Sequence, residues 1–171
     1  NSVGLQNPGV ESFIKDEIPW LKGYDTAIIA NVAGNTVEDY CKMAEIINSV
    51  DEVSAIEVNV SCPNVKEGGV SFGVSACLIE EVTSKMRRLY KKTLIVKLTP
   101  NVTSIVETAK AAEAGGADCV SLINTILGMA VDIHTKRPIL ANNTGGLSGP
   151  CVKPVAVRMV SEVYRNVKIP V

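Results

Sequence analysis

Short apolar segments alternate along this chain with longer segments in which apolar residues recur every three or four positions. The short segments have the length and composition of buried strands. They span residues 25–30, 54–60, 93–99, 118–124 and 168–171. One longer segment carries apolar side chains at Val37, Tyr40, Cys41, Ala44 and Ile47, which is the spacing of one helix face. Buried strands that alternate with amphipathic helices are typical of a parallel α/β sheet.

Polar residues mark where the predicted helices begin. Thr36 has the position of an N-cap, and Asp39, three residues later, gives a capping-box pattern. Thr103 is expected to cap a helix that continues through residue 114, and the last helix is predicted over 152–166. The stretch 125–150 is predicted to be a long connecting segment. Because no linker divides the chain, we expect residues 1–171 to belong to a single domain.

Four predicted strands carry a polar side chain at or near their carboxyl ends. These residues are Asn31, Asn59, Lys97 and Asn124. An open doubly wound sheet concentrates its site at one switch point, whereas every strand of a (β/α)8 barrel contributes to the same mouth. The pattern therefore favours an α/β TIM barrel, of which this chain covers about five βα units. Because the chain starts without Met and stops within the last predicted strand, we expect the barrel domain to be truncated at both ends.

Composition and charge narrow the range of functions. The 171 residues include 17 Lys and Arg against 18 Asp and Glu, and 46% are hydrophobic, which is typical of a soluble globular domain. A net charge of −1 and few aromatic residues (two Phe, one Trp, four Tyr) offer neither the basic surface nor the stacking platforms used to bind nucleic acid. Since no apolar run reaches the ~18 residues of a membrane span and no secretion signal opens the chain, we expect a cytoplasmic protein.

The cysteine pattern argues against a disulfide framework or a metal centre. There are five cysteines, and no two of them form a CxxC pair. We therefore expect no metal ligands. Cys41, Cys77 and Cys119 lie within periodic segments and are expected to be small buried residues.

Cys62 is placed differently, because it follows directly after a predicted strand. Pro63 disfavours a helical conformation at Cys62 and so holds the thiol in an extended turn. Asn59 and Asn64 place amide donors and acceptors on either side of it. Such a loop suits a site that recognises a planar ligand with amide and carboxylate groups while a thiol serves as acid or base, although an ordinary turn uses the same residue types.

The sequence around Cys62 resembles one known family. Residues 59–64, Asn-Val-Ser-Cys-Pro-Asn, and the Val-Lys-Glu-Gly-Gly-Val-Ser-Phe-Gly that follows resemble the active-site loop of dihydroorotate dehydrogenase, in the version of the NAD-linked class 1B catalytic subunit. Five further segments resemble other parts of that family's site, in the same order along the chain. They are residues 1–7, 29–33, 96–102, 123–125 and 140–150, so that the resemblance extends over essentially the whole chain.

This resemblance implies a flavin-dependent oxidation of dihydroorotate to orotate at a CH–CH bond, in de novo pyrimidine (UMP) biosynthesis. It implies that Cys62 is the catalytic base that removes the C5 proton while a hydride passes from C6 to N5 of FMN. The implied substrate-binding residues are Asn1, Ser2, Val3, Gly4, Leu5, Asn59, Asn64, Asn124 and Thr125. The implied FMN-binding residues are Asn31, Asn59, Lys97, Ile123 and Gly149, and the charge of Lys97 would stabilise reduced, anionic flavin.

The resemblance also implies cofactors and partners outside this chain. A separate subunit would carry FAD and a [2Fe–2S] cluster and pass the electrons to NAD. Two catalytic subunits would form a homodimer within a heterotetramer. In the family, the loops that hold the FMN phosphate and one further lysine lie outside the segment matched here, so the chain alone is expected to bind FMN poorly.

Three alternatives stay open at this level. A flavin enzyme similar to dihydropyrimidine dehydrogenase shares a Ser-Cys-Pro loop, although the Asn-Val-Lys-x-Gly-Gly continuation of residues 64–69 argues against it. An inactive ligand-binding fragment would be insensitive to Cys62→Ser. The fumarate-using class of the same family lacks the Gly-Gly-x-x-Phe-Gly arrangement of residues 68–73 and works without an iron–sulfur partner.

Overall fold

A four-stranded parallel sheet forms the centre of the structure, a computed structural model that describes residues 6–61, 66–67 and 70–171. Its strands, in spatial order, are β1 (Ile28–Val32), β2 (Val53–Asn59), β5 (Thr93–Leu98) and β6 (Cys119–Leu122). Every neighbouring pair in this sheet is parallel. The first four strands expected from the sequence are thereby confirmed, with small shifts at their ends.

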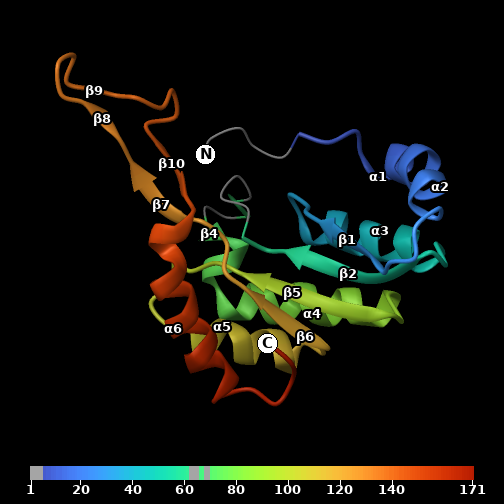
Figure 1. The fold of residues 1–171 in the computed structure, drawn as a ribbon. Coiled ribbons are helices and arrows are strands. Elements are labelled where there is room, and N and C mark those ends of the chain that lie inside the picture. The colour runs from blue at the N-terminus through green and yellow to red at the C-terminus, as the bar shows by residue number, and fades with distance from the viewer. Residues whose placement is uncertain (1–5, 62–65, 68–69) are drawn as a thin grey trace.

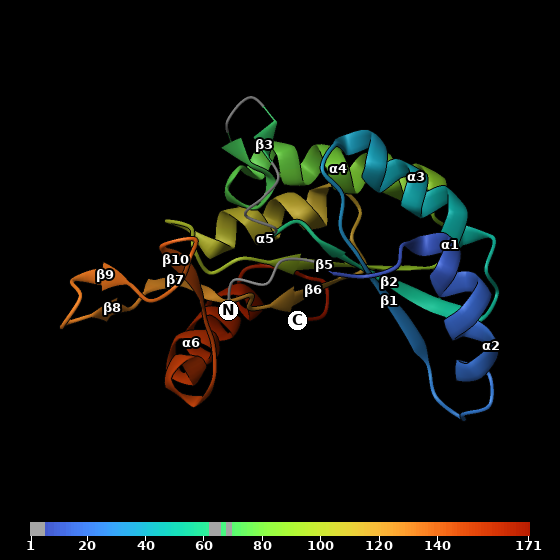
Figure 2. The same ribbon diagram turned by 90° about the horizontal axis from the view of Figure 1, so that it is seen from above.

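A helix follows each of these strands. These helices are α3 (Val37–Asn48), α4 (Ala76–Leu89), α5 (Ile105–Ala114) and α6 (Lys153–Tyr164). Figures 1 and 2 show α3, α4 and α5 side by side on one face of the sheet, and α6 packs beside α5 and β6. The chain therefore forms parallel βα units of a partial (β/α)8 barrel. Before β1, a short helical segment comprises α1 (Val10–Ser12), the π-helical turn η1 (Phe13–Glu17) and α2 (Ile18–Leu21).

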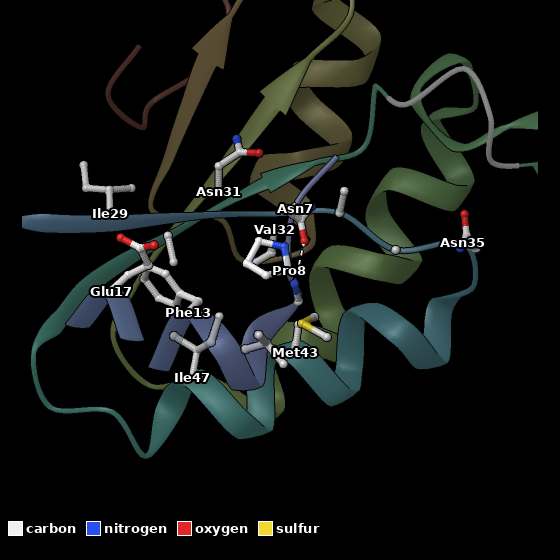
Figure 3. Close-up of a pocket in the computed structure, with 15 residues that line it drawn as sticks. Asn7, Pro8, Phe13, Glu17, Ile29, Asn31, Val32, Asn35, Met43 and Ile47 are labelled. Atoms are coloured by element: carbon white, nitrogen blue, oxygen red, sulfur yellow. Dashed lines mark hydrogen bonds between the residues drawn. The ribbon is translucent and has the colours of Figure 1, made fainter. Parts of the chain in front are cut away.

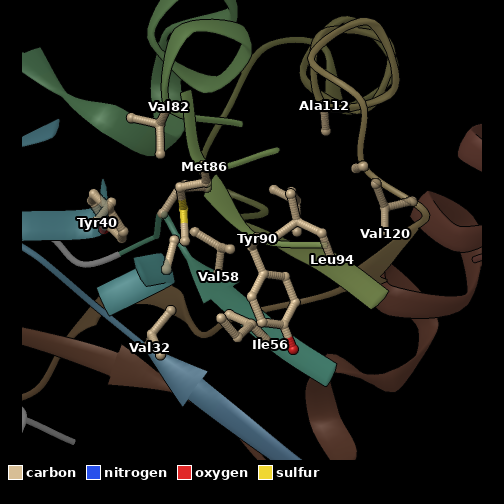
Figure 4. Packing of buried hydrophobic residues seen from close by; sticks show 14 of the residues in the cluster. Val32, Tyr40, Ile56, Val58, Val82, Met86, Tyr90, Leu94, Ala112 and Val120 are labelled. Carbon is tan, nitrogen blue, oxygen red and sulfur yellow. The ribbon is translucent and has the colours of Figure 1, made fainter. Parts of the chain in front are cut away.

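The hydrophobic core lies between the sheet and these helices. Alternate strand residues point into it, because successive side chains of a strand face opposite sides of a sheet. Figure 4 shows Val32, Ile56, Val58, Leu94 and Val120 from the strands facing Tyr40, Val82, Met86 and Ala112 from the helices. The strand residues between these core positions face the opposite, open side of the sheet, where Ile29 is 54% exposed.

The helix starts follow the polar residues of the sequence, with one correction. Thr36 and Asp39 form the predicted capping box of α3, with reciprocal side-chain to backbone hydrogen bonds. The cap of α5 is Ser104 rather than Thr103, since the Ser104 hydroxyl accepts a hydrogen bond from the Glu107 N–H at 3.3 Å. Either residue type caps a helix, and the adjacent pair could not be separated by pattern alone.

The segment 125–150 contains strands that the sequence analysis did not predict. β7 (Ile126–Met129) pairs antiparallel with β10 (Thr144–Leu147), and β8 (Val131–Asp132) pairs with β9 (Arg137–Pro138). Together they form an arm that projects beyond the sheet (Figure 1). A Cβ atom at Gly146 would clash with the Thr125 hydroxyl, so only glycine allows this approach of β10 to the start of β7.

Two further short elements, β3 (Lys66–Glu67) and β4 (Val70–Ser71), form an antiparallel pair between β2 and α4. The 3₁₀ turn η2 (Phe72–Val74) leads from them into α4, and η3 (Pro150–Val152) leads from the arm into α6. In the described ranges, no helix is long and apolar enough to cross a membrane.

Residues 168–171 do not form the predicted fifth strand. The described part of the chain therefore contains four βα units rather than about five. The N–H groups of Lys168 and Ile169 both donate to the Glu113 carboxylate, at 2.7 and 3.3 Å. One backbone hydrogen bond joins this segment to the sheet, from the Val120 N–H to the Pro170 carbonyl at 3.0 Å. The segment lies beside β6 without pairing as a strand.

Candidate functional site

A network of polar side chains crosses the open face of the sheet. The Glu57 carboxylate on β2 accepts a hydrogen bond from the Asn31 side-chain amide on β1 at 2.5 Å. It accepts a second from the Ser121 hydroxyl on β6 at 3.0 Å, and the Lys97 ammonium on β5 lies 3.8 Å from it. One side chain from each strand of the sheet therefore belongs to this network.

Strand register brings these four residues together. Asn31 is paired with Glu57 across β1 and β2, and Lys97 is paired with Ser121 across β5 and β6. Each of them lies between two core positions of its strand, so its side chain is directed to the open face. Apolar neighbours in the sequence thus fix which way these polar groups point.

A second cluster lies at the carboxyl ends of β2 and β6. The side-chain oxygen of Asn59 accepts hydrogen bonds from the Asn124 amide and from the Ser61 N–H, both at 3.2 Å. Asn59 is 8% exposed, and its carbonyl accepts the hydroxyl of Tyr40 at 3.0 Å. The Thr125 N–H donates to the Asn124 side-chain oxygen at 2.8 Å. These contacts hold the two asparagines and Thr125 against one another. Their role in substrate binding stays a prediction.

Asn101 was not among the residues predicted from the sequence, and its side chain holds the segment after β6 through two hydrogen bonds. Its amide donates to the Thr125 carbonyl at 2.9 Å, and its side-chain oxygen accepts the Leu127 N–H at 2.9 Å. A Pro-Asn pair after a strand is a common turn signal, so the sequence indicated where β5 ends but not this second role.

The remaining predicted residues are placed as follows. Ile123 is partly buried and packs against the hydrophobic core beside Asn124. Gly149 has a φ of 103° at the start of η3, where a Cβ atom would meet nothing within 4 Å, and the described contacts do not join it to the network on the sheet. Residues 1–5 together with Cys62 and Asn64 lie outside the described residues, so their roles stay predictions.

A cavity of about 710 Å³ lies along the free edge of β1 and touches the polar network of the sheet face only at Asn31. Phe13, Met43 and Ile47 form much of its lining, and Asn31 is the one predicted site residue that reaches it (Figure 3). The cavity is mainly apolar, whereas the amide, ammonium and carboxylate groups gather on the sheet face. We therefore take the sheet face and its carboxyl-terminal edge as the candidate site.

The donor set on this face fits a flavin ring. An isoalloxazine is flat and carries carbonyl and imide groups along one edge, which amides and an ammonium group suit. Asn31 and Asn59 carry amides here and Lys97 carries an ammonium group, so these side chains would suit the polar edge of such a ring, and Ile123 would be an apolar neighbour. Within the described part of the chain, no group of three or more His, Cys, Asp or Glu residues could hold a metal ion.

Two of the described cysteines, Cys41 and Cys119, are partly buried. Burial raises the pKa of the Cys41 and Cys119 thiols, and the nearby Glu57 carboxylate adds to the effect at Cys119. Cys77 lies in the first turn of α4 and is exposed, so the expectation that it is buried was wrong. Its place at the helix start, rather than on the apolar face, accounts for the difference.

Comparisons with known proteins give one consistent family. A family model described as dihydroorotate dehydrogenase matches residues 1–171. Proteins named dihydroorotate dehydrogenase B (NAD(+)), catalytic subunit, are 62% identical in Alkaliphilus oremlandii, 60% in Phocaeicola vulgatus and 58% in Alkaliphilus metalliredigens. Each match covers 100% of this chain and 56% of the relative. The chain therefore spans little more than half the length of these relatives.

Proposed function

Because the chain belongs to the dihydroorotate dehydrogenase family, we propose that it carries the substrate clamp and part of the flavin site of a catalytic subunit that oxidises dihydroorotate to orotate. The reaction would serve de novo pyrimidine biosynthesis, with NAD as the final electron acceptor, as the names of its relatives indicate. The observation that carries the proposal is the 3.2 Å contact of Asn124 with Asn59, a residue that precedes Cys62 by three positions.

The asparagine cluster supports recognition of a flat pyrimidine. Asn59 and Asn124 come from different strands, yet their amides touch, and Thr125 adjoins them. Amides present donors and acceptors side by side, which matches the imide edge of dihydroorotate. A site built from such groups rejects analogues that lack a partner, since its own buried polar atoms would be left unpaired. We place Asn64 and residues 1–5 in the same clamp by family resemblance.

The sheet face supports a flavin ring beside that clamp. Asn31 and Lys97 would hold the polar edge of the isoalloxazine, and Ile123 would pack on the ring, with Gly149 near the chain that bears the phosphate. Bound FMN supplies a two-electron acceptor for the hydride that leaves C6 of dihydroorotate. The positive charge of Lys97 then favours the reduced, anionic form of the ring.

Cys62 is assigned the role of base. Its thiolate removes the proton from C5 of dihydroorotate while the hydride departs from C6, so that a C5–C6 double bond forms and both electrons of the C6–H bond leave with the hydride. The thiol of a free cysteine ionises near pH 8.5, so the rate is expected to rise with pH through this range unless the site lowers that pKa.

A partner subunit would complete the electron path. The relatives are named catalytic subunits, which implies at least one other subunit in those proteins. We propose that this partner holds FAD and a [2Fe–2S] cluster and transfers electrons to NAD, and that two catalytic subunits form a homodimer within a heterotetramer.

A substrate comparison tests the proposal. Because this chain alone is expected to bind FMN poorly, the assay uses FMN at saturating concentration. Purified protein with an artificial electron acceptor should then oxidise dihydroorotate and not dihydrouracil. Cys62→Ser should lower the rate at least a hundredfold, in line with loss of a general base. Cys77→Ser, which changes an exposed thiol on α4, is the matched control and should retain full activity. Equal rates with dihydrouracil would indicate an enzyme similar to dihydropyrimidine dehydrogenase instead.

A further inference from the structure

Glu57 is the residue on which the polar network of the sheet depends. Its two carboxylate oxygens divide their partners, since Oε1 faces both Asn31 and Lys97 whereas Oε2 accepts from Ser121. Each partner stands on a different strand. A glutamate side chain that is 23% exposed, in a strand otherwise rich in buried apolar residues, is costly to place without such partners.

The carboxylate determines which end of the Asn31 amide faces the ligand. An ionised carboxylate only accepts hydrogen bonds, so the NH₂ group of Asn31 must point toward Glu57. The Asn31 oxygen is then directed away from Glu57 and is available as an acceptor. Without Glu57, the amide has no comparable reason to prefer one of its two orientations.

The same carboxylate places a negative charge next to Lys97. The Lys97 side chain is 32% exposed and its ammonium lies 3.8 Å from Glu57 Oε1, so water screens this pair only in part. An anion at this distance restrains the lysine side chain and offsets some of its field. Since a cation beside a flavin favours the reduced anionic ring, a carboxylate that offsets the cation weakens that preference.

We propose that Glu57 is a positioning residue that orients Asn31 and restrains Lys97 toward the flavin, and that its charge tunes how strongly the site prefers reduced over oxidised FMN. The inference deepens the proposed function, and its flavin readout depends on that function. The contacts with Asn31, Lys97 and Ser121 exist in the chain itself, so they are testable without any flavin.

Two substitutions separate charge from geometry. Glu57→Gln keeps the size of the side chain and an oxygen that accepts from Asn31, but it removes the charge. Glu57→Ala removes both. Glu52→Gln is the matched control, because it makes the same chemical change at the other end of β2, in a surface pair with Lys22. Circular dichroism and thermal unfolding confirm that each variant is folded.

The first readout is acylation of Lys97 in protein without flavin, measured by peptide mass spectrometry. Lys85, whose ammonium donates to the Glu81 carboxylate at 2.7 Å, is the internal reference. Glu57→Gln should raise Lys97 labelling severalfold relative to Lys85, and Glu52→Gln should leave the ratio unchanged. Equal ratios in the two variants would overturn the proposal, whether or not the protein oxidises dihydroorotate.

The second readout is the affinity of the protein for oxidised and for reduced FMN. Glu57→Gln should raise the preference for reduced FMN by about tenfold, equivalent to a shift of about 30 mV toward positive potential for a two-electron couple. Glu57→Ala should also lower the affinity for oxidised FMN by about tenfold, because one oriented hydrogen bond is lost. An unchanged preference in Glu57→Gln would contradict the tuning role, since a merely structural residue would not move it.

A third variant guards against misfolding. Glu57→Asp retains the charge but shortens the side chain. It should therefore keep the wild-type preference between the two flavin forms while lowering the affinity for both. A preference that follows Glu57→Gln rather than the wild type would show that charge is not the cause and would overturn the proposal. Failure of the wild-type protein to bind FMN would count against the proposed function, and the labelling result would still decide the Glu57–Lys97 contact.

Discussion

Two tyrosines of the core are equally buried but differ in what their hydroxyl groups contact. Both side chains are 0% exposed. The hydroxyl of Tyr40 on α3 donates to the Asn59 carbonyl at 3.0 Å. The hydroxyl of Tyr90, at the end of α4, has no hydrogen-bond partner among the described residues, and burial raises its pKa. A buried polar group without a partner lowers stability, whereas a satisfied one contributes to it.

Removing the two hydroxyls should therefore have opposite effects. Tyr90→Phe is expected to raise the free energy of unfolding by about 1 kcal/mol. Tyr40→Phe is expected to lower it by about 1 kcal/mol, because it removes the hydrogen bond to the Asn59 carbonyl. Urea denaturation of both variants measures the difference. A loss of stability in Tyr90→Phe as large as in Tyr40→Phe would show that both hydroxyls are satisfied.

At the level of elements, the start of α3 provides a pH-dependent contribution to stability. The pKa of Asp39 lies below its ordinary value because the N–H of Asn35 donates to its carboxylate, and the Thr36 N–H adds to this effect. A group with a lower pKa in the folded state stabilises that state above its unfolded pKa, and the contribution disappears as the pH falls through the folded pKa.

Asp39→Asn should accordingly lose less stability in acid than the wild type does. The difference in the free energy of unfolding between the two proteins is expected to be largest at neutral pH. It should shrink as the pH falls below 3.8, the ordinary pKa of aspartate. Thermal unfolding from pH 7 to pH 2 measures it, with Asp51→Asn as a control for removal of an exposed aspartate. Parallel profiles for Asp39→Asn and the wild type would contradict the assignment.

The elements of the sheet could be predicted well because each has a clear local signal. Apolar runs identified β1, β2, β5 and β6, and helical spacing identified the helices between them. The arm β7–β10 could not be predicted in this way. Its strands are short, and they form through antiparallel pairing within residues 125–150 rather than from a local alternation of apolar and polar residues. The contacts of Glu57 could not be predicted from the sequence either. A single glutamate in an apolar strand acquires its partners only through the register of the neighbouring strands.

Some of the residues named from the sequence lie close together in the structure, for a simple geometric reason. Parallel strands direct their carboxyl ends to one edge, so Asn59 and Asn124 meet although 65 residues separate them. Asn31 and Lys97 meet in the separate network on the sheet face, where both lie against Glu57. Gly149 has no such link among the described contacts, and a glycine in a turn carries too little information to place it.

For the molecule as a whole, the sheet has one face covered by helices and one open face. β1 pairs with β2 alone among the described strands, so its other edge is free, and a mainly apolar cavity of about 710 Å³ lies along it. A free strand edge of this kind tends to pair with another chain. We predict that the 171-residue chain self-associates.

Ile29→Lys should weaken this association, because it places a charge at a β1 residue that is 54% exposed. Sedimentation equilibrium over a range of protein concentrations measures the effect. Val157→Lys, at a residue of α6 that is 59% exposed, serves as the control and should leave the association unchanged. A wild-type chain that remains monomeric at all concentrations would contradict the prediction.

The most direct test of the account is the visible absorption spectrum of the protein with FMN in excess, recorded without oxygen before and after dihydroorotate is added. We predict that dihydroorotate bleaches the flavin band in the wild-type protein and that Cys62→Ser abolishes the bleaching. A flavin band that persists in the wild type at saturating dihydroorotate would contradict the claim that these residues carry the oxidation.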